Sequence, residues 1–319
     1  MTAARPGLEQ NLRRILAEFT GGDPMRVGVL WTNLSLRELS RRLLALGTPA
    51  SRRTIRRLLR KLKLGRRTAR KKKTMGQHPD RNAQFENIGR LRQEYQAAGE
   101  PVISIDTKKK ELLGNFHRPG TTYTERTVET FDHDFGSAGR GKLIPHGIYD
   151  LANGHAHIHL NTSHDTSELC CDSVASWWEQ YGRAAYPTAR RLLILCDGGG
   201  SNSATQYLFK EDLQGLANRL GLELRVAHYP PYCSKYNPIE HRVFPHLTRA
   251  CQGVIFHTLD VARHFLERAR TATGLRVTVS VLEKVYATGR KCAEGFKEAM
   301  KIVFDDFLPK WNYRAVPAT

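Results

Sequence analysis

Residues 191–202 read RLLILCDGGGSN, in which five apolar residues in a row precede an aspartate and three glycines. A short apolar run bounded by turn residues is typical of a strand that is buried on both faces of a sheet. Residues 102–106, VISID, form a second apolar stretch that also ends on an aspartate. If the two strands are neighbours, their ends meet and both carboxylates lie at one edge of the sheet.

The pattern around these two strands predicts an α/β domain of the ribonuclease-H-like class. Its other elements are indicated by hydrophobic periodicity and by turn signals such as Asn153-Gly154. In chain order we expect strands at 102–106, 143–149 and 155–161, a helix at 166–181, a strand at 191–196, a helix at 203–220, a strand at 222–227 and a helix from 237 onward. The order β-β-β-α-β-α-β-α is the ribonuclease-H-like arrangement.

Residues 34–64 predict a second, all-α unit with helix-turn-helix spacing. Two stretches with apolar residues on one helical face are separated by Gly47 and Pro49, and Ser51 is a favourable N-cap for the second helix. The opposite face of that second helix carries the side chains expected to contact DNA, which are Arg52, Arg53, Arg56, Arg57, Arg60 and Lys61. The alternative is a solvated basic helix in a small helical bundle.

Most of the positive charge of the chain lies before residue 101. The formal net charge is +19, and residues 1–100 supply +15 of it, with 23 Lys and Arg against 8 Asp and Glu. Such a field attracts polyanions, and a dense basic cluster is most easily tolerated beside phosphates. We expect a flexible basic linker whose Lys71, Lys72 and Lys73 also contact DNA. The predicted domains are a DNA-binding region at 1–75 and a catalytic domain at 76–319, which opens with an amphipathic helix capped by Asp80.

Composition argues against a membrane protein, a disulfide-stabilised protein and a zinc module. No apolar run approaches the ~20 residues that a membrane-spanning helix needs, and the amino terminus lacks the apolar stretch of a signal peptide. The six cysteines form no CxxC pair, and the glycines at 198–200 belong to no nucleotide-binding motif. We therefore expect a cytoplasmic, nucleoid-associated protein with reduced, mostly buried thiols.

Three acids have distinctive places in this order. Asp106 and Asp197 end strands, and Glu240 lies in the first turn of the helix that begins near residue 237. Carboxylates brought together repel one another unless cations lie between them. Their oxygens suit Mg²⁺ or Mn²⁺, and two such ions about 4 Å apart can activate an attacking oxygen and stabilise a leaving oxygen on phosphorus. Each acid alone could serve only a turn or a helix terminus, but together they predict phosphodiester chemistry.

The residues around the third acid carry a family resemblance. Pro230-Pro231-Tyr232, Ser234 and the run NPIEH at 237–241 are similar to the signature of the Tc/mariner and related insertion-sequence transposases. The chain resembles the Rhodopirellula-type DDE transposases still more closely, from Gly22 to Tyr313, in the segments VISIDTKKKELLGNF, HDF, PHGIYDL, TSHDT, CDGGGSN, SKYNPIEHRVF and WNY. That resemblance implies that Asp106, Asp197 and Glu240 are the metal-binding triad. Members of that family usually have a further helix-turn-helix region before the one at 34–64.

The residues and the resemblance together predict a DNA transposase, which is a polynucleotidyl transferase. Water would first attack a phosphodiester at the element end, and the freed 3′-hydroxyl would then attack target DNA. The expected partners are double-stranded DNA, at the transposon ends and at the target, and further copies of the chain in a synaptic complex. Two alternatives stay open: a ribonuclease-H-like nuclease that only hydrolyses DNA, and a catalytically silent repressor derived from a transposase.

Several other side chains have more than one interpretation. His155, His157 and His159 share one face of a strand, for which a solvated or DNA-facing position is favoured over a zinc site. The lysines at 108–110 could meet substrate phosphates or form a solvated face. His164 and Asp165 could belong to the outer part of the site or could cap a loop. Trp177 and Trp178 are expected to pack between a helix and the sheet.

Overall fold

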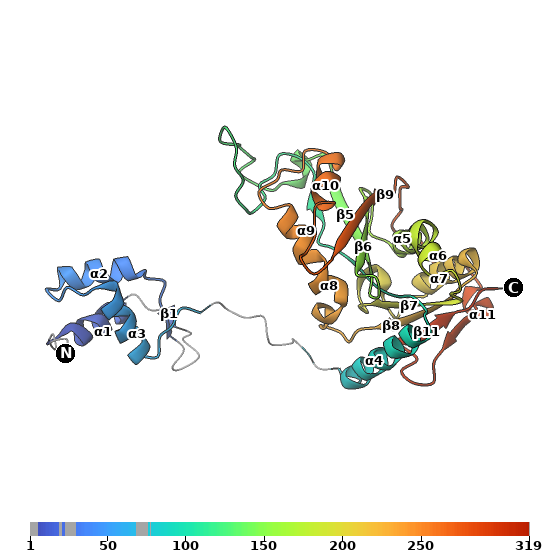
Figure 1. Ribbon diagram of the computed structural model, residues 1–319, viewed down its shortest axis with the longest axis horizontal. Helices are drawn as coiled ribbons and strands as arrows, with labels where there is room; N and C mark the ends of the chain where they lie inside the picture. The colour runs from blue at the N-terminus through green and yellow to red at the C-terminus, as the bar shows by residue number, and fades with distance from the viewer. Residues whose placement is uncertain (1–5, 19–20, 23–29, 68–75, 77, 319) are drawn as a thin grey trace. The chain divides into compact units, whose positions relative to one another are not determined.

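The computed structural model describes residues 6–18, 21–22, 30–67, 76 and 78–318. The chain divides into two compact units, residues 1–73 and 74–319 (Figure 1). No helix in the described part of the chain has the length and apolar character needed to cross a membrane. The six cysteines are free thiols, and five of them are buried.

The first unit is a small helical cluster with its own apolar core. Its described helices are α1 (Leu8–Glu18), α2 (Leu36–Ala45) and α3 (Arg52–Lys61). Ser51 caps α3 as predicted, because its hydroxyl accepts a hydrogen bond from the Thr54 N–H at 3.2 Å. Buried side chains from all three helices form the core: Leu12, Ile15, Leu39, Leu43 and Ile55.

The expectation that this unit is all-α was wrong in one respect. Two strands of two residues each, β1 (Gly21–Gly22) and β2 (Leu30–Trp31), pair antiparallel. Strands this short leave no alternation of apolar and polar residues in the sequence, so periodicity cannot reveal them. Sequence patterns also missed α1, although its buried leucines lie at helical spacing.

The second unit is built on one large mixed sheet. The strand order is β10-β11-β8-β7-β3-β5-β6-β9, with β4 paired to the end of β5. The strands are β3 (Val102–Thr107), β4 (Glu111–Leu112), β5 (Lys142–Asp150), β6 (His155–Asn161), β7 (Arg191–Cys196), β8 (Glu223–His228), β9 (Arg276–Val281), β10 (Ile302–Phe304) and β11 (Asn312–Ala315). Strands β3, β7 and β8 are parallel, and β5 is antiparallel to β3 and to β6.

The central order β6-β5-β3-β7-β8 is the ribonuclease-H-like topology that the sequence predicted. All five strands lie within two residues of the expected positions. Four described strands of this unit were not predicted: β9, β10 and β11 extend the sheet at its two edges, and the short β4 pairs with the end of β5. The helix predicted at 166–181 continues through a π-helical turn, Trp178–Gly182, and Trp177 and Trp178 are buried in the core as expected.

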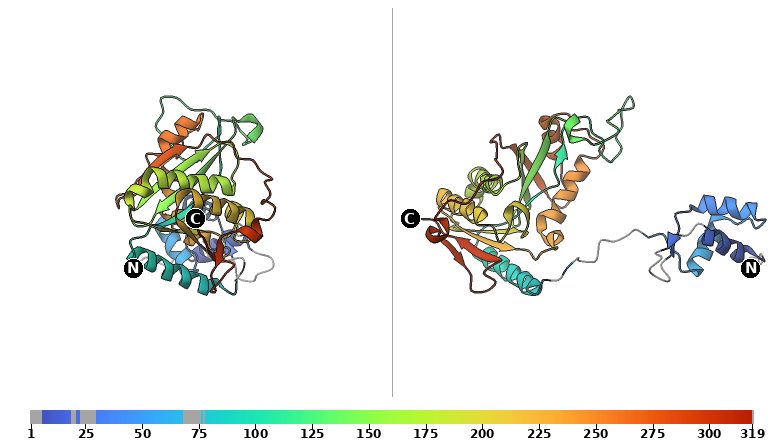
Figure 2. Two further views of the ribbon diagram at one scale, coloured as in Figure 1. Left: turned by 90° about the vertical axis from the view of Figure 1, so that its right-hand side faces the viewer. Right: turned by 180° about the vertical axis from the view of Figure 1, so that it is seen from behind.

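Helices cover both faces of the sheet (Figures 1 and 2). The described α-helices of this unit are α4 (Arg81–Ala97), α5 (Ser167–Trp177), α6 (Arg183–Ala185), α7 (Tyr207–Leu220), α8 (Pro238–Arg242), α9 (Phe244–Ala250), α10 (Leu259–Leu266) and α11 (Phe296–Ala299). One core lies under α5 and α7, whereas α4 and the α8–α10 segment bury two further cores. Burial on both faces explains why β7 is almost entirely apolar.

Asp80 occupies the N-cap position of α4 but does not cap it. Its side chain makes no capping hydrogen bond. Its carboxylate instead accepts a hydrogen bond from the indole N–H of Trp311, at 3.4 Å. The predicted cap was therefore wrong, because a tertiary contact with the carboxyl-terminal segment takes the carboxylate away from the helix.

Two of the three alternating histidines of β6, His157 and His159, are buried, which corrects the expected solvated or DNA-facing position, whereas His155 is half-buried. Strand β6 lies between β5 and β9, and His159 is paired with His146 of β5. Both ring nitrogens of His146 and the Nδ1 atoms of His157 and His159 have no hydrogen-bond partner among the described residues. Burial lowers the pKa of His146 to about 4 and that of His159 to about 3. These histidines are neutral members of the core at physiological pH.

Neutral buried histidines predict a loss of stability in acid. As the pH falls from about 6.5 to about 4, unfolded histidines take up protons that the folded protein excludes, so the free energy of unfolding decreases. His159→Gln should reduce this slope by about 1.4 kcal/mol per pH unit. Denaturant titrations from pH 4 to 7 measure it, with the exposed His257→Gln as the matched control. An unchanged slope in the His159 variant would show that this histidine titrates alike in both states.

Candidate active site

The parallel pairing of β3 with β7 brings two of the predicted acids to one edge of the sheet. The ladder pairs Ser104 with Leu195. The same register continued by two residues places Asp106 opposite Asp197, so both side chains lie on the same face of the sheet. Both are partly exposed. Reactants from solvent can therefore reach them.

Helix α8, which packs on the sheet beside Asp106, carries the third acid, Glu240. Gly147 of β5 is paired with Asp106, and a Cβ atom at Gly147 would lie only 2.6 Å from the Cδ1 atom of Ile239. The missing side chain lets α8 approach the sheet directly beside Asp106. Glu240 follows Ile239 and is partly exposed, like the two aspartates.

The carboxyl groups of Asp106 and Glu240 interact directly. Burial, together with the negative charges of Asp197 and Glu240, raises the pKa of Asp106 to about 8. Burial is also the main cause of the raised pKa of Glu240, whereas the hydrogen bond with Asp106 acts in the opposite direction. Both effects agree with a protonated Asp106 that donates a hydrogen bond to an ionised Glu240.

Asp197 has a fourth carboxylate as its neighbour. Burial raises the pKa of Asp197, and the charge of Asp165 raises it further. Asp165 accepts a hydrogen bond from the Thr107 hydroxyl at 3.1 Å and lies 3.7 Å from the Lys110 ammonium. Asp165 was left open between the outer part of the site and a loop cap, and its contacts place it beside the triad.

The donor set fits a hard divalent cation in chemistry. All three acids have raised pKa values, and no basic side chain is among the main causes. Oxygen donors without a local countercharge are what Mg²⁺ and Mn²⁺ bind. As placed, however, no three His, Cys, Asp or Glu side chains of the described residues form a ready metal cage. The side chains would have to move to close ligands around an ion.

Side chains of the carboxyl-terminal segment support the loop that carries Asp197. The ring of buried His228 hydrogen-bonds to the Asp197 carbonyl at 2.8 Å and to the Tyr313 hydroxyl at 2.9 Å. Trp311 packs against Gly198, where a Cβ atom would lie 3.0 Å from the indole ring. The residues WNY at 311–313 reach this loop because β11 pairs with β8.

Glu240 is one of the residues that line a groove of about 810 Å³. Phe244 and Phe256 contribute apolar lining, and Lys109 and Lys110 contribute positive charge. Lys108 does not serve as a free cation, because it forms a 2.5 Å ion pair with Glu111. All three lysines line the groove, and two of them also form ion pairs, Lys108 with Glu111 and Lys110 with Asp165, which the sequence could not distinguish.

Helix α3 of the first unit presents the predicted basic face to solvent. Arg52, Arg53, Arg56, Arg57 and Arg60 are all exposed, and none forms an ion pair with another described residue. Lys61 differs, because its ammonium lies 2.6 Å from a Glu9 carboxylate oxygen of α1. Lys71, Lys72 and Lys73 lie outside the described residues.

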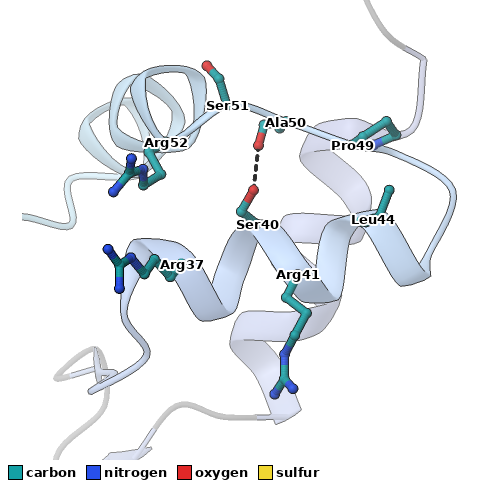
Figure 3. A pocket seen from close by; sticks show the side chains of 8 residues that line it. All are labelled: Arg37, Ser40, Arg41, Leu44, Pro49, Ala50, Ser51 and Arg52. Carbon is teal, nitrogen blue, oxygen red and sulfur yellow. Dashed lines mark hydrogen bonds between the residues drawn. The ribbon is translucent and has the colours of Figure 1, made fainter.

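A hollow of about 540 Å³ lies between α2 and α3. Figure 3 shows Arg37 and Arg52 extending from the two helices on the same side of it. The Ser40 hydroxyl joins the helices by donating a hydrogen bond to the Ala50 carbonyl at 2.8 Å. Two arginines, one from each helix, therefore line a hollow whose helices are joined by a hydrogen bond.

The sequence matches the family described as Rhodopirellula transposase DDE domain over residues 11–317. The chain belongs to this transposase family. The family and the transposase activity predicted from the sequence are thereby confirmed. No curated protein matches the chain.

Solved structures of Mos1 transposase are similar to the chain at low identity. One is the Mos1 transposase paired-end complex with left transposon end, with 13% identity, a TM-score of 0.48, and coverage of 83% of this chain and 72% of that chain. Another is the Mos1 mariner paired end complex with Mn, with 13% identity, a TM-score of 0.45 and the same coverage.

The buried charge of Asp106 predicts that the transposase is destabilised by its own site. A raised pKa means that the folded state binds a proton more tightly than the unfolded state, so stability falls as the pH rises from about 4 to about 8. In a buffer that contains a chelator of divalent ions, Asp106→Asn should therefore raise the free energy of unfolding at pH 8 by at least about 1 kcal/mol. Denaturant unfolding measures it. The control is Asp132→Asn, whose side chain is 93% exposed. A variant less stable than the wild type would contradict the repulsion.

Proposed function

We propose that this transposase cuts and joins DNA with two divalent metal ions held by Asp106, Asp197 and Glu240. The observation that carries the proposal is the convergence of three partly buried carboxyl groups, all with raised pKa values, at one sheet edge. When bound, Mg²⁺ or Mn²⁺ would activate the attacking oxygen and stabilise the leaving oxygen on phosphorus.

The residues of the chain supply position and proton control. Asp106 and Asp197 are fixed by the β3–β7 ladder, and Glu240 by the packing of α8 on β5. The proton shared by Asp106 and Glu240 must leave before both can act as ligands, so ion binding should strengthen as the pH rises through neutrality. Neighbouring Asp165 adds negative charge, which favours cations at the same edge.

The proposed substrate is double-stranded DNA at the transposon ends and at the target. The exposed arginines of α3 form an uncompensated basic face of the kind that enters a major groove. The groove that Glu240 helps to line would offer Lys109 and Lys110 to phosphates of the strand being cut. Two ends must be held together for joining, so we further propose that copies of the chain assemble into a synaptic complex, in the cytoplasm at the nucleoid.

The triad assignment predicts separate effects on chemistry and on affinity. Asp106→Asn, Asp197→Asn and Glu240→Gln should each abolish cleavage of labelled element ends in Mg²⁺ or Mn²⁺, because each removes a metal ligand. DNA affinity should stay near the wild-type value, since none of them removes a phosphate contact. Asp132→Asn is the matched control. Near-normal cleavage by any triad variant would exclude that residue from the site.

The products of the same assay distinguish the alternatives. A transposase yields both cleaved ends and joined strands, whereas a hydrolytic nuclease yields cleavage alone. A repressor binds the ends and yields no metal-dependent product. The raised pKa values of the triad favour an active metal site over a silent one, because uncompensated charge is costly to keep without a function.

The basic face of α3 predicts that sequence reading and phosphate attraction can be separated. Among Arg52, Arg53, Arg56 and Arg57, replacing one that reads a guanine by Ala should cost about 1–3 kcal/mol on the cognate end and much less on random DNA. Replacing Lys71, Lys72 and Lys73 together should weaken binding to all DNA and reduce the salt slope by up to about 3. Salt titrations on cognate and random duplexes measure both.

The control for these titrations is Arg14→Ala, which removes one exposed positive charge from α1 of the same unit. It should weaken cognate and random DNA alike, if it has any effect. Identical profiles for the α3 arginine variants and the lysine variant would mean that α3 contributes charge without base reading.

A further inference from the structure

Two buried polar side chains connect the strand of Asp106 to the helix of Glu240. Ser104 of β3 and Asn237, which precedes α8, are both fully buried. The Ser104 hydroxyl donates a hydrogen bond to the Asn237 Oδ1 atom at 2.5 Å and accepts one from the Ile239 N–H at 3.0 Å. The Asn237 Nδ2 atom donates to the Ile105 carbonyl at 2.9 Å. We call these three hydrogen bonds the Ser104–Asn237 clamp.

The clamp contacts the backbone of the residue that precedes each acid, which is Ile105 before Asp106 and Ile239 before Glu240. Ser104 and Asp106 lie on the same face of β3, because side chains alternate along a strand. Asn237 and Glu240 are three residues apart, which places them on the same side of the first turn of α8. Asp106 follows Ser104 on β3, and Glu240 follows Asn237 on α8. The hydrogen bonds between Ser104 and Asn237 therefore set the distance between the two acids.

The start of α8 is held by contacts with other elements and not by a side-chain cap of its own. The helix contains five residues, and Asn237, at its N-cap position, makes no side-chain capping hydrogen bond. Pro238, the next residue, has no N–H to donate. An asparagine at this position ordinarily caps its own helix, so the use of its amide across to β3 is a tertiary function.

We infer that Ser104 and Asn237 are positioning residues that hold Glu240 at the distance from Asp106 needed to share metal ions. The inference rests on the proposed function, because it assumes that these acids are metal ligands. Neither side chain would touch an ion or DNA. Both act through the carboxylate that they place, in the way that outer hydrogen bonds orient the ligands of other metal sites.

The test is direct binding of Mn²⁺ by the full chain, measured from the free-ion signal in electron paramagnetic resonance. Ser104→Ala and Asn237→Ala should each raise the Mn²⁺ dissociation constant by about 10-fold or more. The double variant should bind little worse than the weaker single variant, because both changes open one clamp. Ser104→Thr keeps the hydroxyl and should restore most of the affinity.

The matched control is Ser173→Ala, which removes another fully buried hydroxyl, one that donates to the Leu169 carbonyl within α5. A merely structural role would lower the unfolding temperature of the Ser104 variant and leave Mn²⁺ affinity in the folded protein unchanged, as in this control. Wild-type affinity in either folded clamp variant would overturn the inference. The two variants open the clamp from opposite sides, so one that does not fold can be replaced by the other, or by Asn237→Ser.

Two further variants separate the inference from the function on which it rests. If Asp106→Asn and Glu240→Gln bind Mn²⁺ like the wild type, the proposed metal site itself is wrong. If both lose Mn²⁺ while the clamp variants keep it, the metal site holds and only the positioning role is excluded.

Discussion

The parallel pairing of β3 with β7 is the constraint on which the site depends. Parallel neighbours end at the same edge of a sheet, so the acids that follow the two apolar runs are brought together by backbone hydrogen bonds and not by their own interaction. A slip of one residue in this register would turn Asp197 to the opposite face. Leu192 and Ile194 pack in one core, and Leu193 and Leu195 pack in another. A slip would exchange these two sets of closely packed side chains, and so the packing of both cores fixes the geometry of the carboxylates.

That geometry is unfavourable for stability. Three partly buried acids and a fourth beside them repel one another, and burial makes each charge harder to sustain. The surrounding core offsets this cost, because a fully buried aliphatic or aromatic side chain contributes about 1.5–3 kcal/mol. Functional sites commonly lower the stability of a fold in this way. A bound cation would reduce the repulsion between the carboxylates.

The sequence predicted the centre of the sheet and not its edges. Strands β3 and β7 are unbroken apolar runs between turn signals, which is a local pattern. Strands β10 and β11 are short; β11 pairs with β8, a segment about ninety residues earlier in the chain, and β10 pairs with β11. The burial of His159 could not be predicted either, because alternating polar residues are typical of an exposed strand and only the neighbours β5 and β9 exclude solvent here.

Some residues of the candidate site can be predicted from local sequence, and others only from tertiary contacts. Asp106, Asp197 and Glu240 were identified from positions along the chain, whereas the contacts of Asp165 with Thr107 and Lys110 depend on how loops meet after folding. Asn237 shows most clearly how a tertiary contact replaces the role that the sequence predicts. Its type and position predict a helix cap, but capping would satisfy only the short helix α8, whereas the hydrogen bonds to β3 satisfy a buried hydroxyl and a strand carbonyl together. The Ser104 hydroxyl also accepts a hydrogen bond from the Ile239 N–H at the buried start of α8, so the buried polar groups of the clamp are paired. The placement of Glu240 therefore becomes a property of the strand that carries Asp106.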